Sequence, residues 1–264
     1  CYVPASISSD NNINLVNISL GVNGQDAIEL SGGTIGYSGS SVTREWNLSG
    51  VTLNVTASLV VQSNSANAVS SLKINGDAIF AFPDGEGIQV GHSSDSGKRG
   101  IINASGATFT AQDQDDQWAG IRFNNYSDDA GTILENCTVE YATAGIYCQS
   151  SNPTITNTVF RYNEDGIDAD DASRPTVTDN SFTENTRPVS VYAQRIDSTL
   201  YGNTYTDNVK DYIEVQSDFI EDNGVFIWAK DNAPYVVNGH VYVQRDNNNS
   251  QLSTLRIEDG TIVQ

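Results

Sequence analysis

Three consecutive stretches of the chain repeat one pattern: TAGIYCQSSNPTITNTVFRYN (143–163), EDGIDADDASRPTVTDNSFTEN (164–185) and TRPVSVYAQRIDSTLYGNTYTDN (186–208). Each stretch holds short runs of Val, Ile, Thr, Tyr and Phe, which favour strands. The runs are separated by Asn, Asp, Gly and Ser, which favour turns. No part of the chain shows a sustained period of about 3.6 residues. The sequence therefore predicts an all-β protein.

Residues 118–142 join the same alignment, and four columns of residues then recur at steps of 21 to 25 residues. This spacing predicts a solenoid with about 22 residues and three short strands per rung, in which apolar columns stack into a narrow core. Asn in the fourth column suits a left-handed corner and can bond the Asn of the next rung. The alternative is a β-sandwich with chance spacing. The columns are Ile121, Ile146, Ile167 and Val189; Leu134, Ile155, Val177 and Leu200; Val139, Phe160, Phe182 and Tyr205; and Asn163, Asn185 and Asn208.

These repeats resemble the right-handed parallel β-helix of the pectin-lyase-like superfold. More narrowly, they resemble the noncatalytic β-helix regions of large secreted and cell-surface proteins. The resemblance is carried by WAGI at 118–121, LENC at 134–137, and the paired Gly-Ile and Pro-Thr-(Ile/Val) repeats. It is clearest over 118–208 and weaker over 46–117. It implies a right-handed parallel β-helix and leaves the function open, because one fold hosts many functions.

A longer repeat relates the two ends of the chain, because residues 46–82 match residues 228–264. We therefore expect an N-terminal β segment over 1–45, a β-helix repeat unit over 46–227 and the start of a second copy over 228–264. The matched pairs are Trp46 with Trp228, Val61-Gln62 with Val243-Gln244, Leu72-Lys73-Ile74 with Leu255-Arg256-Ile257, and, upstream, Asp26–Leu30 with Asp211–Val215.

The chain stops at Gln264, just after a predicted strand and without a predicted cap. A solenoid end without a cap presents unpaired backbone and bare core. We expect either a fragment of a longer tandem protein or a cover formed by another copy. The second case predicts a head-to-tail homo-oligomer or filament.

Charge narrows the classes of partner. The chain has 13 Lys and Arg against 33 Asp and Glu, a formal net charge of −20. Binding to nucleic acid or to an anionic membrane surface needs clustered cations, so neither is expected. No apolar run approaches the roughly 20 residues of a membrane span. A chain that begins at Cys1 and lacks Met is typical of a processed product that is secreted, extracellular or on the cell surface.

The three cysteines, Cys1, Cys137 and Cys148, are an odd number. In a secreted protein they predict one disulfide plus one free or intermolecular thiol, so all three are candidates for a disulfide or a crosslink. The alternative is that all three are small buried or incidental thiols. Cys1 could also carry lipid.

The residue sets of catalytic β-helices are not matched. Polygalacturonase-like enzymes use Asp-Asp, Gly-His-Gly and Arg-Ile-Lys sets, and of these only Asp170-Asp171 is present. The two histidines, His92 and His240, have no evident acidic partner. The outward positions of the alignable rungs are expected to be Thr, Ser, Asn and Asp, without a row of cations or aromatic rings. No enzymatic activity is therefore expected.

An acidic cluster in EDGIDADDA is the best candidate binding site. Asp168, Asp170 and Asp171 could hold Ca²⁺, which takes six to eight oxygen ligands. They could instead form a glycosidase pair or a solvated loop. No other cofactor is expected. The three tryptophans, Trp46, Trp118 and Trp228, are expected to be packing anchors, with sugar-stacking platforms as the alternative.

The favoured hypothesis is a secreted, noncatalytic structural β-helix that associates end to end into a filament or surface layer. Two alternatives belong to other classes: a polysaccharide lyase or hydrolase, and a carbohydrate-binding adhesin module. Both would have a polysaccharide as partner.

Overall fold

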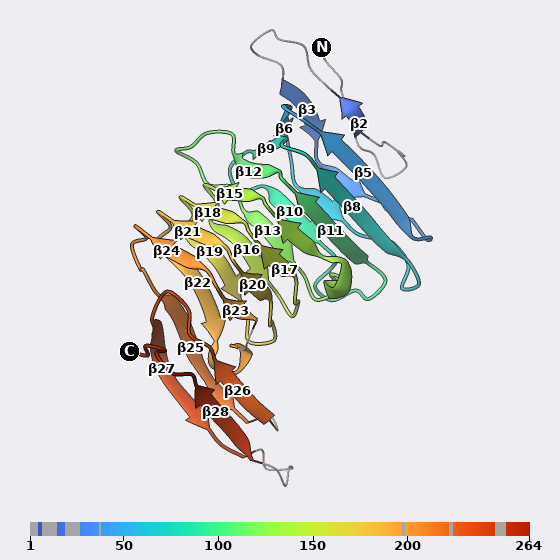
Figure 1. Ribbon diagram of the computed structural model, residues 1–264. Helices are drawn as coiled ribbons and strands as arrows, with labels where there is room; N and C mark the ends of the chain where they lie inside the picture. Colours follow the sequence, from blue (N-terminus) through green and yellow to red (C-terminus); the bar gives the residue numbers. More distant parts are fainter. Residues whose placement is uncertain are drawn as a thin grey trace.

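The computed structural model describes residues 28–36, 38–196, 199–221, 224–245 and 252–264, and the backbone alone of 5–6, 15–18 and 27. In this part of the chain, three parallel sheets wind into a right-handed parallel β-helix (Figure 1). The predicted all-β solenoid with three strands per rung is thereby confirmed. Within the same residues, no helix is long and apolar enough to cross a membrane.

Each sheet takes one strand from each successive rung, and the strands of a sheet are all parallel. Sheet A contains β1 (Ala5–Ser6), β3 (Ala27–Ser31), β6 (Thr52–Val55), β9 (Ile79–Phe82), β12 (Thr108–Ala111), β15 (Thr138–Glu140), β18 (Val159–Arg161), β21 (Ser181–Thr183) and β24 (Thr204–Thr206). Sheet B contains β2 (Leu15–Ile18), β5 (Val42–Leu48), β8 (Val69–Asn75), β11 (Arg99–Ser105), β14 (Ile133–Glu135), β17 (Thr154–Thr156), β20 (Thr176–Thr178) and β23 (Leu200–Tyr201).

Sheet C carries the face on which the candidate site lies. It contains β4 (Gly33–Ile35), β7 (Leu59–Val61), β10 (Gly87–Val90), β13 (Gly120–Phe123), β16 (Ala144–Cys148), β19 (Asp165–Ala169), β22 (Arg187–Tyr192), β25 (Ile213–Ile220) and β27 (Tyr235–Val243). A separate pair is formed by β26 (Gly224–Trp228) and β28 (Ser253–Ile257). Two short 3-10 helices, η1 (Asp129–Gly131) and η2 (Ala193–Arg195), lie between strands.

The three apolar columns predicted from the repeats stack as expected. In sheet C, Ile121 pairs with Ile146, Ile146 with Ile167, and Ile167 with Val189. The columns of Leu134 in sheet B and Val139 in sheet A continue in the same way through the later rungs. One hydrophobic core cluster contains these columns, except that Tyr205 is partly buried and packs against the cluster.

The asparagine column forms a hydrogen-bonded ladder, as predicted. Nδ2 of Asn163 donates to Oδ1 of Asn185 at 3.0 Å, and Nδ2 of Asn185 donates to Oδ1 of Asn208 at 3.0 Å. The ladder ends at Asp211, whose Oδ1 accepts from Nδ2 of Asn208 at 2.9 Å. A carboxylate has no proton with which to continue the ladder.

The prediction that these asparagines adopt the left-handed backbone conformation is wrong, because that conformation occurs one residue earlier. The positive φ belongs to the residue before each Asn: Tyr162 (58°), Glu184 (55°) and Asp207 (58°). The reason is that two consecutive residues have different roles at the corner. The preceding residue makes the turn and leaves its side chain exposed, whereas the Asn side chain points inward to bond the next rung.

A second ladder, which the repeats did not predict, lies at the corner between sheets B and A. Nδ2 of Asn180 donates to Oδ1 of Asn203 at 3.1 Å, and Nδ2 of Asn203 donates to Oδ2 of Asp231 at 3.2 Å. Asn180 and Asn203 are both buried. Both corners of sheet A are therefore held by asparagines in the C-terminal rungs.

The long repeat holds in part. Trp46 pairs with Ile74, and Trp228 pairs with Ile257 in the same register, so this match is a structural equivalence. The match of 26–30 with 211–215 is not, because β3 belongs to sheet A and β25 to sheet C. Within the described residues, sheet A ends at β24. The segment boundaries expected at 46 and 228 fall inside β5 and at the end of β26, and they stay a prediction.

All three tryptophans pack inside the solenoid, as expected. Trp46 stacks on Phe80 with ring centroids 6.0 Å apart, and Trp118 stacks on Phe82 at 4.8 Å. Nε1 of Trp228 donates to the carbonyl of Ala193 at 3.2 Å. Each tryptophan is at most 1% exposed, so none of them is a sugar-stacking platform in this structure.

Candidate functional site

One row of side chains runs outward along sheet C, because strand alternation places the residue after each inward Ile on the opposite face. Neighbours in the row are paired in register on consecutive strands, at the usual spacing of about 4.8 Å between strands. The row reads Gln89, Arg122, Tyr147, Asp168, Ser190 and Glu214. The expected Thr, Ser, Asn and Asp are found at Asp168 and Ser190, but Arg122 and Tyr147 depart from that expectation.

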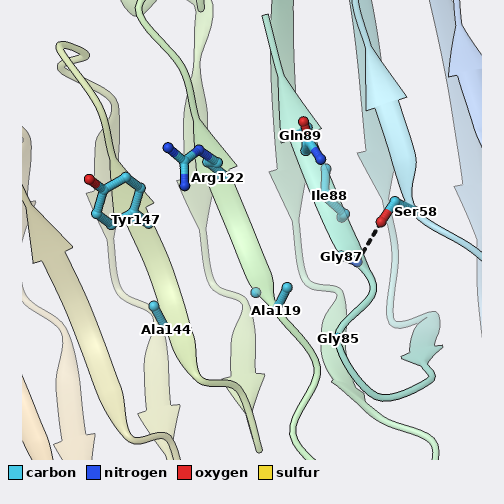
Figure 2. A pocket seen from close by; sticks show the side chains of 10 residues that line it. Ser58, Gly85, Gly87, Ile88, Gln89, Ala119, Arg122, Ala144 and Tyr147 are labelled. Atoms are coloured by element: carbon cyan, nitrogen blue, oxygen red, sulfur yellow. Dashed lines mark hydrogen bonds between the residues drawn. The ribbon is translucent and has the colours of Figure 1, made fainter. Parts of the chain in front are cut away.

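A first hollow of about 310 Å³ lies over β10, β13 and β16 (Figure 2). Figure 2 shows Gln89, Arg122 and Tyr147 standing in a row on these three strands. The amide of Gly87 donates to Oγ of Ser58 at 3.1 Å. Most of the remaining lining residues are Gly or Ala, which leave space above the strands. The lining also includes Gly85, Ile88, Ala119, Gly120 and Ala144.

Arg122 and Tyr147 form a stacked pair beside this hollow. The guanidinium carbon of Arg122 lies 4.5 Å from the ring centroid of Tyr147. Two hydrogen bonds hold the guanidinium in place: Nε donates to Oδ1 of Asn124 at 3.0 Å and Nη2 to Oε1 of Gln149 at 2.8 Å. The pair is a planar platform in a fixed orientation. Burial raises the pKa of the Tyr147 hydroxyl, so it stays a protonated hydrogen-bond donor.

A second hollow of about 240 Å³ continues the first across β16, β19, β22 and β25. Tyr147 lines both hollows and so marks the boundary between them. The lining of the second hollow is mostly polar, which suits a ligand that offers hydrogen bonds or charge. Its other lining residues are Asp168, Ala169, Asp170, Arg187, Ser190, Tyr192 and Gln216.

Arg187, the cation that lines the second hollow, forms ion pairs with two carboxylates. Arg187 donates from Nε and Nη2 to the two carboxylate oxygens of Asp165, both at 2.6 Å, and from Nη1 to Glu214 at 3.2 Å. Lys210 donates from Nζ to the same Glu214 at 2.9 Å. Burial alone would raise the pKa of Glu214, but these two cations outweigh it and hold that pKa below its usual value.

Asp168 stands apart from this network. Within the described residues, no Lys, Arg or His nitrogen lies within ion-pair distance of its carboxylate. Burial raises the pKa of Asp168, and a hydrogen bond with Ser190 opposes that shift. Asp168 is therefore a carboxylate that faces the hollow with spare hydrogen-bonding capacity.

The other two predicted metal ligands have different surroundings. Oδ1 of Asp170 accepts from Oγ of Ser173 at 2.6 Å and from the backbone N–H of Ser150 at 3.0 Å, so it holds its own turn. Asp171 is exposed, and it does not line the hollow. No group of three or more His, Cys, Asp or Glu that could hold a metal ion occurs among the residues that the structure describes.

A family model described as periplasmic copper-binding protein (NosD) matches residues 31–248. The chain belongs to the NosD family. Comparison with curated proteins and with solved structures gives no match. The match covers most of the solenoid, including every strand of both hollows. The description of the NosD family names a periplasmic copper-binding protein.

The donors that copper prefers are imidazole, thiolate and thioether groups, and this NosD-family chain has 2 His, 3 Cys and no Met. Nδ1 of His92 accepts from the backbone N–H groups of Ser94 and Asp95, at 3.2 and 3.1 Å. His240 is exposed on β27, beside Tyr242. The described residues do not bring these donors together, so they do not fit a copper site.

Cys137 and Cys148 also lie apart from each other in the solenoid. Cys137 lies at the corner before β15, and Cys148 pairs with Phe123 and Ala169 in an interior column of sheet C. Both are buried free thiols. Burial raises the pKa of Cys137 to about 11 and also raises that of Cys148, which disfavours the thiolate. Cys1 lies outside the described residues, so its proposed pairing or lipidation stays a prediction.

Proposed function

We propose that the chain is a noncatalytic glycan-binding β-helix of the NosD family. The observation that carries the proposal is the pair of hollows that meet at Tyr147, on one outward row of consecutive rungs. A sugar ring offers an apolar face to an aromatic platform and hydroxyls to polar neighbours. The Arg122–Tyr147 platform and the amides of Gln89 and Gln216 supply both kinds of contact.

The shape of the site favours an extended ligand. The row crosses several rungs at about 4.8 Å each, so successive units of a linear chain would meet successive side chains. The net charge of −20 disfavours a polyanionic glycan, which the protein would repel at long range. We infer binding without cleavage, because Arg187 and Glu214 are held in ion pairs and Asp170 holds a turn.

The family description supports a location outside the cytoplasmic membrane, and we propose that this chain works there. Copper binding, which the same description names, is not part of this proposal, because the described donors do not converge.

The test is calorimetric titration with a panel of soluble polysaccharides. We expect at least one to bind, and Tyr147→Ala to weaken it by about tenfold, the equivalent of roughly 1.4 kcal/mol. Tyr201→Ala is the matched control, because Tyr201 is exposed on sheet B, away from the hollows. Incubation of the protein with these polysaccharides should release no reducing or unsaturated sugar ends. Binding to none of the panel, or an equal loss in both variants, would contradict the proposal.

A second function, end-to-end association of the solenoid, is favoured by one observation. The rung formed by β28 presents side chains of the interior columns to solvent: Ile257 pairs with the buried Trp228 yet is 47% exposed. We propose that a second copy covers this rung. Contact between unlike ends of two copies would be head to tail and would extend into a filament.

A further inference from the structure

The charge of the second hollow is unbalanced. Asp165 and Glu214 are neutralised by Arg187 and Lys210, with which they form ion pairs. The carboxylate of Asp168 lines the same hollow without such a partner among the described residues. Arg187 lies near enough to attract Asp168, but its guanidinium donates its hydrogen bonds to Asp165 and Glu214. Asp170, the other carboxylate of the lining, accepts hydrogen bonds from Ser150 and Ser173. The hollow therefore keeps an excess of negative charge, and Asp168 is the carboxylate placed to bind a cation.

Two tyrosines line the hollow beside Asp168. Tyr147 and Tyr192 both line it, each on a strand next to β19. Burial raises the pKa of Tyr192, and several nearby aspartates add to the shift, which reports the same negative field. A carboxylate beside aromatic rings is the arrangement that attracts an ammonium group, through an ion pair and cation–π contact.

Hydrogen-bonding groups complete the lining. Nε2 of Gln216 donates to Oε1 of Glu214 at 2.8 Å and lies 3.3 Å from Oγ of Ser190, so its carbonyl oxygen can accept a further bond. The floor of the hollow thus offers acceptors, which an ammonium or a hydroxyl group can satisfy. The first hollow adjoins it, so a ligand with its amine here would extend over the Arg122–Tyr147 platform.

We propose that the second hollow binds the protonated amine of an amino sugar, with Asp168 as its counter-ion, so that the glycan is cationic. This inference rests on the proposed function and names the ligand class for the same face. An N-acetylated sugar would place a neutral amide against Asp168 and leave the carboxylate without a counter-ion.

The experiment compares glucosamine oligomers with N-acetylglucosamine oligomers of equal length, by calorimetric titration of the whole chain. Salt of about 150 mM shortens the screening length to roughly 8 Å, which suppresses attraction to the distant negative surface. We expect the glucosamine oligomer to bind about tenfold more tightly, as one partly buried ion pair supplies. Asp168→Asn should abolish this preference.

The control variant is Asp116→Asn, which removes the same charge from an exposed loop before Trp118. It should keep the preference for the amine. Equal affinity of the two oligomers, or a preference that survives Asp168→Asn, would overturn the inference. An oligolysine that binds as tightly as glucosamine and depends equally on Asp168 would overturn it too, because the ligand would then be a cationic peptide.

The two proposals fail in different ways. If neutral glycans bind in a manner that depends on Tyr147, and without a preference for the amine, only the assignment of Asp168 falls. If no glycan of either kind binds, the proposed function itself falls.

Discussion

Asn185 shows how one side chain holds a corner of the solenoid. Its Oδ1 accepts from the backbone N–H and from Nδ2 of Asn163, at 3.1 and 3.0 Å. Its Nδ2 donates to Asn208 and to the carbonyl of Phe160, at 3.0 and 2.9 Å. Asn185 is fully buried, so water cannot replace these partners.

We expect Asn185→Ala to lower the free energy of unfolding by about 2–4 kcal/mol, because it leaves several buried polar groups unpaired. Urea denaturation measures the change. The control is Asn54→Ala, at an exposed outward position of β6, where the loss should stay within about 0.5 kcal/mol. Equal losses in the two variants would show that the ladder contributes little.

Cys137 occupies the corner position that Asn180 holds two rungs later. Its thiol makes the free energy of unfolding fall at alkaline pH. Burial raises its pKa from 9.0 to about 11. The folded state therefore holds the proton more tightly than the unfolded state. This stabilisation is complete below about pH 9 and is lost as the pH rises through about 11.

Cys137→Ala removes this titration, and Ala107 already fills the same corner in the rung before. Between about pH 8 and pH 11, the parent should lose roughly 2–3 kcal/mol more than the variant, from about 1.4 kcal/mol per pKa unit. Urea denaturation under reducing conditions at the two pH values measures this. A difference between parent and variant that does not change with pH would contradict the assignment.

At the scale of strands, the glycine that precedes an inward Ile, such as Gly166, lets the backbone of sheet C lie close to the phenylalanine rings of the core. A Cβ atom on Gly166 would lie 2.4 Å from the carbonyl oxygen of Pro188 and 2.9 Å from the ring of Phe182. The Phe160–Phe182 stack, with centroids 5.0 Å apart, fills the space that a side chain at this position would need. The repeated Gly-Ile pairs of the sequence thus record a packing requirement.

Gly166→Ala should lower the free energy of unfolding by about 1–3 kcal/mol through overpacking. Gly39→Ala is the matched control, because its nearest neighbour would be 3.6 Å away, an ordinary contact. Thermal denaturation of the two variants decides the point. If Gly166→Ala melts with the parent, the ring stack is looser than the structure implies.

The strands that the sequence predicts best are those with constant spacing. From Ile121 to Val189 the rungs are short and nearly equal in length, so the spacing of the columns predicts the strand register correctly. Before them, Ile88 pairs with Ile121 across two loops, and this longer step hides the column. Beyond β24, the described strands belong to sheet C and to the β26–β28 pair.

The candidate site was harder to predict than the columns. Alternation correctly places Asp168 outward, and the same rule applies to Arg122 and Tyr147, which follow Ile121 and Ile146. Their importance depends on neighbours from other rungs. The Arg122–Tyr147 stack joins residues 25 positions apart, and the ion pairs of Arg187 decide which carboxylate stays without a cation. Such partners are fixed by register and rotamer, which spacing alone does not report.

At the scale of the whole molecule, exposed apolar side chains gather in the last described rungs. Ile257, Leu252 and Ile262 are 47%, 73% and 58% exposed. The backbone edge of β28, like any strand edge, can pair with a further strand. A second copy that covers this rung would bury apolar area and satisfy the backbone groups together.

The 264-residue chain should therefore form species larger than a monomer, whose size rises with concentration in light scattering. Ile257→Asp should shift it to monomer, because the contact would have to bury an unpaired charge. Thr254→Asp is the matched control: Thr254 lies on the same strand with the opposite alternation, so the charge would stay in solvent and association should persist. A parent that remains monomeric at all concentrations would end the association hypothesis. Loss of association in both variants would mean that charge repulsion, and not the apolar rung, controls assembly.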